Sequence, residues 1–279
     1  MKIILSRKGF DSAAGGYPSP IMADKTLLSI PIPDRSGSIS YDSLTYQGLS
    51  YYKILSDLIP SSLKHNKERL VLDKKTTCHL DPDLIESTYI REGSWRGVFG
   101  QSGAAETHLR NNDINKGDIF LFFGWFRKTI IEEGVLHYCK NDKSGRHIIY
   151  GYLQVGEIID LAKNEKLPKW VKYHPHINKK ASMNRLYIAS EKLSFADNIK
   201  GYGGFKLNNK LILTKEGLSR SKWHLPKIFQ GLEITYHSKE SWKEDYFQCA
   251  LRGQEFVIEE SNQINDFAKE LILNSERLR

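Results

Sequence analysis

Two long apolar runs, each interrupted by glycine, constrain the fold of this chain most strongly. They are IFLFFGWFR, at residues 119–127, and HIIYGYLQVGEII, at residues 147–159. β-Branched and aromatic residues dominate both runs, which favours strands over helices. The turn residues Asn115–Asp118 precede the first run, and a polar stretch at 140–146 separates the two. We therefore predict two strands joined by a long hairpin loop, and the glycines indicate a small, strongly bent sheet or barrel.

Shorter segments predict the elements around this hairpin. Residues 50–59 have helical spacing and stop at Pro60, and residues 261–278 place Ile264, Phe267, Leu271 and Ile272 on one helical face. The stretch 81–110 reads as mostly loop, with a helix only near 104–110. Further strands or extended segments are predicted at 2–6, 26–34, 68–73, 186–190 and 210–214. Together these features predict one α+β domain over residues 1–279, with peripheral helices around a mixed, bent sheet or small barrel.

The positive charge of the chain is concentrated in one segment. The whole sequence has 41 Lys and Arg residues against 33 Asp and Glu, whereas residues 163–228 alone have 15 against 4. Cations attract phosphates and aromatic faces stack on exposed bases, so basic and aromatic residues together favour a nucleic-acid surface. The alternative is a solvated, lysine-rich face over a normally packed core. The aromatic residues of this segment are Trp170, Tyr173, Tyr187, Phe195, Tyr202, Phe205 and Trp223.

The rest of the composition argues against several classes of protein. The longest apolar run is far shorter than the roughly 20 residues that cross a bilayer, and the opening MKIILSRKGF does not resemble a signal peptide. Cys78, Cys139 and Cys249 are widely spaced with no CxxC pair, which argues against disulfides and a cysteine-based zinc site. We therefore expect a cytoplasmic protein that makes no membrane contact.

Two polar segments supply candidate carboxylates beside cations or strands. In SRKGFDSAAGG, a predicted strand ends in a glycine-bearing loop that carries Asp11 close to Arg7 and Lys8. The alternative for this segment is an ordinary surface turn. In RGQEFVIE, Glu255 precedes a predicted strand and supplies a second carboxylate.

Two further segments raise the question of a metal. In HLDPDL, Asp81 and Asp83 flank a proline, which suits either metal coordination or, more commonly, the cap of a helix. His174 and His176 in YHPHIN are separated by a single proline. Two histidines alone do not define a metal site, so we predict none.

Other polar and aromatic residues are candidates for contacts to a base. The glycine-rich segment SWRGVFGQSG offers Trp95 for stacking and Gln101 for hydrogen bonds, unless these groups only satisfy the loop backbone. Arg127 ends an apolar strand, where a guanidinium needs either a pocket or a buried partner. Trp223 and His224 in SKWHLP adjoin the basic segment.

A resemblance to a known family follows from these segments in combination. KIILSRKGFDSAAGG with PSPI and IPIPD, then HLDPDL, GVFGQ, GDIFLFFGWFR, YGYLQVGEI, WHLP and RGQEF, resembles the nucleotide modification associated domain 3 family over essentially the whole chain. That family is linked with DNA base-modification and phage-conflict systems, so the resemblance implies DNA or modified nucleotides as the target. Residues of about 114–160 also resemble the core hairpin of PUA-like barrels, which include readers that take a modified base out of the stack.

From these observations we predict a DNA glycosylase that acts on a flipped, bulky modified base, such as glucosylated hydroxymethylcytosine in phage DNA, in antiphage defence. A carboxylate would stabilise the oxocarbenium-like sugar or activate water, and this hydrolysis needs no cofactor. We expect DNA as the partner, with no cofactor, metal or protein partner. The predicted catalytic carboxylate is Asp11, with Glu255 and Asp81 as alternatives. The predicted base contacts are Gln101, Arg127, Trp95, Trp223 and His224, and the predicted contacts to the DNA backbone are Arg7, Lys8, Lys179, Lys180, Arg185, Arg220 and Lys222.

Three alternative functions fit the same sequence. A non-catalytic reader would bind modified DNA without releasing a product. A base-modifying transferase would add mass to the DNA from a donor. A nuclease would need Mg²⁺ at a carboxylate cluster.

Overall fold

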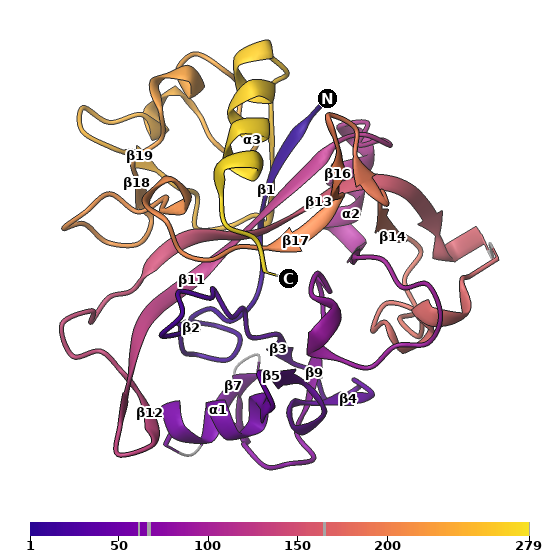
Figure 1. Cartoon of the computed structure of the whole chain (residues 1–279). Helices are drawn as coiled ribbons and strands as arrows, with labels where there is room; N and C mark the ends of the chain where they lie inside the picture. Colours follow the sequence, from indigo (N-terminus) through magenta and orange to yellow (C-terminus); the bar gives the residue numbers. More distant parts are fainter. Residues whose placement is uncertain (61, 66–67, 164–165, 279) are drawn as a thin grey trace.

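The computed structural model describes residues 1–60, 62–65, 68–163 and 166–278 (Figure 1). Within these residues, nine strands form one mixed sheet, and three α-helices and several two- or three-stranded sheets surround it. The predicted α+β class is confirmed. The main sheet has two ends, at β10 and β20, and none of the described sheets closes into a barrel. Of the two predicted alternatives, the structure therefore contains the bent sheet and not the small barrel.

The predicted hairpin forms the centre of the main sheet. β11 (Ile119–Glu132) pairs antiparallel with β13 (Arg146–Asp160), and β12 (Val135–Tyr138) folds back onto the end of β11. The register shifts by one residue between Phe122 and Phe123, which bends the pair as the glycines indicated. A Cβ on Gly124 would lie 2.7 Å from the carbonyl oxygen of Lys8, so a glycine is needed where the chain leaving β1 crosses β11.

The first strand of the chain lies between two distant segments. β1 (Ile3–Arg7) pairs parallel with β11 and antiparallel with β20 (Glu255–Ile258). On the other side of the hairpin, β14 (Asn184–Ala189) pairs with β13, and β10 (Val98–Ser102) pairs with β14. The strand order is therefore β10-β14-β13-β11-β1-β20. Two short strands join its sides, β2 (Ser19–Ile21) on β11 and β17 (Tyr202–Gly204) on β13.

Smaller sheets extend the structure on both sides of the main one (Figure 1). One has three strands, in the order β3 (Ile32–Pro33), β9 (Thr77–His79) and β4 (Ile39–Ser40). The others are antiparallel pairs: β5 (Thr45–Tyr46) with β6 (Leu49–Ser50), β7 (Ser62–His65) with β8 (Glu68–Val71), β15 (Lys192–Leu193) with β16 (Ala196–Lys200), and β18 (Lys222–Trp223) with β19 (Phe247–Gln248).

Two of the three α-helices begin at serine side-chain caps and pack by one apolar face. Ser50 accepts the backbone N–H of Lys53 at the start of α1 (Tyr51–Leu58), and Ser261 accepts that of Ile264 at the start of α3 (Asn262–Asn274). In α3, the predicted face carries buried Ile264, Leu271 and Ile272, with Phe267 partly buried. α2 (Gly103–Asn111) follows β10. Short 3₁₀ helices occupy Tyr41–Ser43, Glu86–Thr88, Leu161–Lys163, Lys169–Tyr173, Asn209–Leu211, Lys227–Phe229 and Lys239–Ser241. Among the described residues, no helix has the length and apolarity needed to span a bilayer.

One predicted strand is absent, and one strand was not predicted. Residues 210–214 form no strand, because the Asn208 side chain accepts the backbone N–H of Lys210 and starts a 3₁₀ helix. In 81–110, residues 81–97 are loop apart from one short 3₁₀ helix and the helix near the end is present, but the prediction missed β10, which pairs with β14. Asp81 and Asp83 also cap no α-helix, since the chain continues from them as loop to the 3₁₀ helix Glu86–Thr88.

Candidate functional site

A cavity of about 720 Å³ opens where β1 ends. Arg7, Lys8 and Asp11 line it from β1 and its following loop, and Gly100 and Gln101 line it from β10. Its other walls come from the β3–β9 region (Ile32, Pro33, Asp34, Ser36, His65, His79 and Asp81), residues 175–179 and residues 251–254. A second cavity, of about 770 Å³, contains none of the predicted site residues. The 720 Å³ cavity is therefore the candidate site, and we call it the β1 pocket.

A buried ion pair forms one wall of the β1 pocket. The register of β1 and β20 sets Ser6 opposite Glu255, which brings Lys8 beside the same carboxylate. Lys8 Nζ lies 2.6 Å from Glu255 Oε1, and Gln101 Nε2 donates to the same oxygen at 2.6 Å. Glu255 is 1% exposed, and its Oε2 has no hydrogen-bond partner among the described residues. The carboxylate thus lies directly behind Lys8 and Gln101, with one oxygen unused.

Asp11 is held in the pocket wall by its own loop. Its Oδ1 accepts the backbone N–H groups of Ala13 and Ala14, both at 2.7 Å. Gly15 closes this turn with φ +80°, and a Cβ there would lie 2.3 Å from the ring of Phe10. Oδ1 therefore stabilises the turn, as the side-chain oxygen of an aspartate commonly does. Oδ2 makes no hydrogen bond within the described chain and remains available to a ligand.

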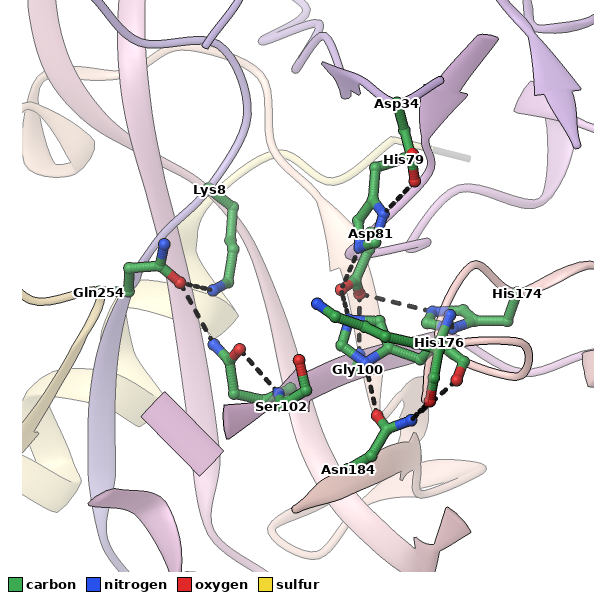
Figure 2. A network of polar contacts seen from close by, with 12 residues as sticks. Lys8, Asp34, His79, Asp81, Gly100, Ser102, His174, His176, Asn184 and Gln254 are labelled. Carbon is green, nitrogen blue, oxygen red and sulfur yellow. Dashed lines mark hydrogen bonds and ion pairs between the residues drawn. The ribbon is translucent and has the colours of Figure 1, made fainter. Parts of the chain in front are cut away.

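Histidines surround the Asp81 carboxylate on the opposite wall (Figure 2). Asp81 Oδ2 lies 3.7 Å from Nε2 of His79 and 3.4 Å from Nε2 of His176. Asp81 Oδ1 accepts the backbone N–H of Gly100 at 2.8 Å and lies 3.5 Å from Nε2 of His174. The Asp81 side chain is only 4% exposed. We call His79, Asp81, His174 and His176 the histidine cluster.

The other ring nitrogen of each histidine has a partner of its own. His79 Nδ1 lies 2.9 Å from Oδ2 of Asp34, and His176 Nδ1 lies 2.7 Å from Oδ1 of Asn184. His174 Nδ1 accepts the backbone N–H of His176. These second partners fix the orientation of all three rings, so that every Nε2 faces Asp81.

The electrostatics of the cluster favour an ionised Asp81. Burial alone would raise the pKa of Asp81, but the three imidazoles that face it outweigh burial and hold that pKa well below its ordinary value. Burial would likewise lower the pKa of His79, yet Asp34 and Asp81 on its two sides raise it. For His174, which is completely buried, burial dominates and lowers the pKa.

The β1 pocket brings together most of the predicted catalytic residues and some of the predicted contact residues. Asp11 and Asp81 line the β1 pocket and Glu255 lies behind its wall. The predicted contact residues in the lining are Gln101, Arg7, Lys8 and Lys179. The predicted residues outside the lining are Trp95, Trp223, His224, Arg127, Lys180, Arg185, Arg220 and Lys222.

The predicted base contacts outside the lining have other surroundings. Trp223 is 1% exposed and donates to His147 Nδ1, and Trp95 is buried and donates to the hydroxyl of Tyr173. Arg127 packs over the ring of Tyr138 and donates to a backbone carbonyl, and His224 lines a separate, apolar cavity. In this conformation none of the four faces the β1 pocket, because core packing occupies the two indoles and local partners hold the arginine.

The basic segment also differs from the surface that its composition suggested. All seven of its aromatic residues are buried or partly buried, so they pack rather than form an open stacking surface. Several of its cations have local partners: Arg185 lies 3.4 Å from Glu106, Arg220 packs over Trp125 and Lys222 over Tyr246. Lys179 is exposed and lines the pocket. Residues 164–165 of the segment lie outside the described part of the chain.

The histidine cluster includes residues that sequence reasoning did not select. His79 was not chosen, nor was its partner Asp34, and His174 and His176 were noted but set aside. The signal was present in HLDPDL and YHPHIN, but these segments are about a hundred positions apart. The pairing of β10 with β14 joins them, since β10 carries Gly100 and β14 begins at Asn184.

Comparisons with known proteins give one match. The sequence model of a family described as nucleotide modification associated domain 3 matches residues 2–259. Neither a curated protein nor a solved structure shows a significant match.

Proposed function

The chain belongs to the nucleotide modification associated domain 3 family, and from that premise we propose that it is a DNA glycosylase which removes a bulky modified base from phage DNA. A role associated with nucleotide modification follows from the family itself. The finer proposal depends on the β1 pocket, which combines cations, hydrogen-bonding amides and a carboxylate with a free oxygen in one concavity.

The size and lining of the pocket carry the proposal. Its volume of about 720 Å³ lies in the range of sites that enclose whole small molecules, and it suits a flipped nucleotide with an enlarged base. Gln101 and Gln254 offer amide groups to a base edge. Lys179 and Arg252 are exposed at the pocket and would meet the phosphates on either side of the flipped nucleotide.

Asp11 is the carboxylate that best fits the chemistry. Its Oδ2 is available beside the pocket while Oδ1 is fixed by two backbone N–H groups, so the charge is held at a defined position. An anion there would stabilise the oxocarbenium-like sugar as the N-glycosidic bond breaks, or orient the attacking water. Glu255 is the alternative, because its Oε2 is also unpartnered, but Lys8 and Gln101 separate it from the cavity.

The test uses purified protein and phage DNA with and without glucosylated hydroxymethylcytosine. We expect mass spectrometry to detect the free modified base, and alkali to cleave the abasic sites left behind. Asp11→Asn keeps the oxygen that accepts from Ala13 and Ala14, so it should fold normally yet lose at least about 100-fold in rate, as expected when one charge that stabilises a transition state is removed.

A control variant and the released products distinguish the glycosylase from the alternative functions. Asp42→Asn alters a half-buried carboxylate in the 3₁₀ helix Tyr41–Ser43, outside the pocket, and should leave the rate unchanged. Full activity in Asp11→Asn with loss in Glu255→Gln would transfer the catalytic role to Glu255. Modification-dependent binding without any released base would instead identify a reader, and a gain in DNA mass would identify a transferase; either result contradicts the glycosylase.

A further inference from the structure

We propose that His79, Asp81 and His176 bind one divalent transition-metal ion, through Nε2 of each histidine and Oδ2 of the aspartate. One ligand atom from each residue lies within 4.8 Å of the other two. Two ligands about 2.1 Å from a tetrahedral ion are separated by about 3.4 Å. The distances of 3.4 and 3.7 Å from Asp81 Oδ2 to the two Nε2 atoms are close to that separation.

The hydrogen bonds of His176 show that its Nε2 faces the carboxylate as an acceptor. Asn184 Nδ2 donates to two backbone carbonyls, those of His176 and Lys179, which identifies its other terminal atom as the oxygen. That oxygen lies 2.7 Å from His176 Nδ1, so Nδ1 carries the hydrogen. In the neutral ring, Nε2 then presents a lone pair to Asp81 Oδ2.

His79 repeats this arrangement from another strand. Its Nδ1 lies 2.9 Å from the Asp34 carboxylate, which accepts hydrogen bonds only, so Nδ1 is again the donor and Nε2 the free acceptor. When both rings are neutral, two nitrogen lone pairs and a carboxylate oxygen converge on one point. A bound cation relieves their mutual repulsion, as protons on the rings do when no metal is bound. A carboxylate or amide oxygen behind each histidine is the usual support of a metal ligand.

The Gly100 backbone holds the carboxylate in position for this role. Asp81 Oδ1 accepts the backbone N–H of Gly100, which leaves Oδ2 for the ion. His174 Nδ1 accepts the backbone N–H of His176, and its Nε2 faces Asp81 Oδ1 at 3.5 Å without a hydrogen bond. A Cβ on Gly100 would lie 2.6 Å from the His176 ring, so glycine allows this close approach.

The donor set defines the class of ion. Two imidazoles and one carboxylate suit Zn²⁺, Fe²⁺, Mn²⁺ or Co²⁺, whereas Mg²⁺ and Ca²⁺ prefer oxygen ligands alone. All three ligand residues line the β1 pocket, so the remaining coordination positions of the ion face a bound molecule. This inference does not depend on the glycosylase proposal, because it concerns metal binding by the protein without DNA.

The test is metal binding by the full chain after removal of metal with a chelator. We expect calorimetry to give one Zn²⁺ per chain, and Co²⁺ to give the visible d–d absorption of an ion bound by nitrogen and oxygen. His176→Gln and His79→Gln should each weaken Zn²⁺ binding by at least about 100-fold. Asp34→Asn and Asn184→Ala, which remove only a supporting contact, should weaken it by about 10- to 100-fold.

Controls separate a ligand role from a general effect on the fold. His65→Gln changes a histidine that lines the same pocket but contacts the Pro33 carbonyl instead, and it should bind Zn²⁺ as the wild type does. If circular dichroism shows that His176→Gln does not fold, the Zn²⁺ affinities of Asn184→Ala and Asp34→Asn test the proposal instead. A wild-type protein that binds neither ion, or folded variants that bind it as tightly as the wild type, would overturn the proposal.

Discussion

The buried pair of Asp83 and Arg91 gives a sharp prediction about stability. Their side chains are 1% and 2% exposed, and the guanidinium contacts both carboxylate oxygens, with Nε at 2.8 Å from Oδ2. The hydroxyl of Tyr173 also donates to Asp83 Oδ2, at 2.5 Å. The pair fixes the segment that carries Asp81 into the histidine cluster, because Asp83 is bonded through its backbone to Val98 at the start of β10.

We expect Asp83→Asn to lower the free energy of unfolding by about 3–5 kcal/mol, because it leaves the guanidinium buried without a counter-charge. Burial raises the pKa of Asp83 even against the adjacent guanidinium, which shows that its desolvation cost is large. Removing both charges should therefore be far less damaging than removing one. Asp83→Asn with Arg91→Met should recover at least half of the loss.

Urea unfolding followed by tryptophan fluorescence would measure all four corners of this double-mutant cycle. The matched control is the exposed pair of Lys200 and Glu86, whose side chains are 60% and 68% exposed. Its disruption should cost less than about 1 kcal/mol. A loss below about 1 kcal/mol in Asp83→Asn, or a double variant whose loss equals the sum of the two single losses, would refute the reasoning.

Two other predictions concern pH and salt. Burial, with help from Arg7 and Arg220, lowers the pKa of His147 to about 3 from 6.5, so between these values only the unfolded chain binds the proton. Stability should therefore fall as the pH falls through this window, by about 3 kcal/mol at pH 4.5, and urea unfolding of His147→Gln should show a flatter pH dependence. Lys179→Ala should weaken binding to modified DNA and reduce the slope of log affinity against log salt concentration by about 1. Lys74→Ala, which changes a lysine away from the pocket, should leave that slope unchanged. Equal slopes in the two variants would contradict a phosphate contact at Lys179.

Local patterns in the sequence predicted the parts of the fold that local forces decide. The hairpin of β11 and β13 is confirmed because its residues are apolar on both faces and its turns carry glycine. α1 and α3 are confirmed because each combines a serine cap with one apolar face. β10 was missed because its sequence, VFGQS, has no alternation, and only pairing with β14 makes it a strand.

The candidate site was predicted in part for a similar reason. Arg7, Lys8 and Asp11 lie within a few residues of one another at the end of β1 and in the loop after it, so the local sequence was enough to select them. The histidine cluster depends on segments brought together by strand pairing, and neither HLDPDL nor YHPHIN contains enough ligands alone. We expected no metal because each segment was judged by itself, HLDPDL as a helix cap and YHPHIN as too few ligands. Trp223 was selected as a stacking residue because a sequence does not distinguish a buried indole from an exposed one.

The pairing of β1 makes the site depend on segments that lie far apart in the sequence. β1 pairs with Ile119–Phe123 on one edge and with Glu255–Ile258 on the other, so its second edge is covered only by a segment much further along the chain. Lys8 meets Glu255 only when that segment pairs. A fragment that stops before residue 255 would therefore lack a finished cavity, and the pairing of two strands so distant in sequence makes completion of the site a late event in folding.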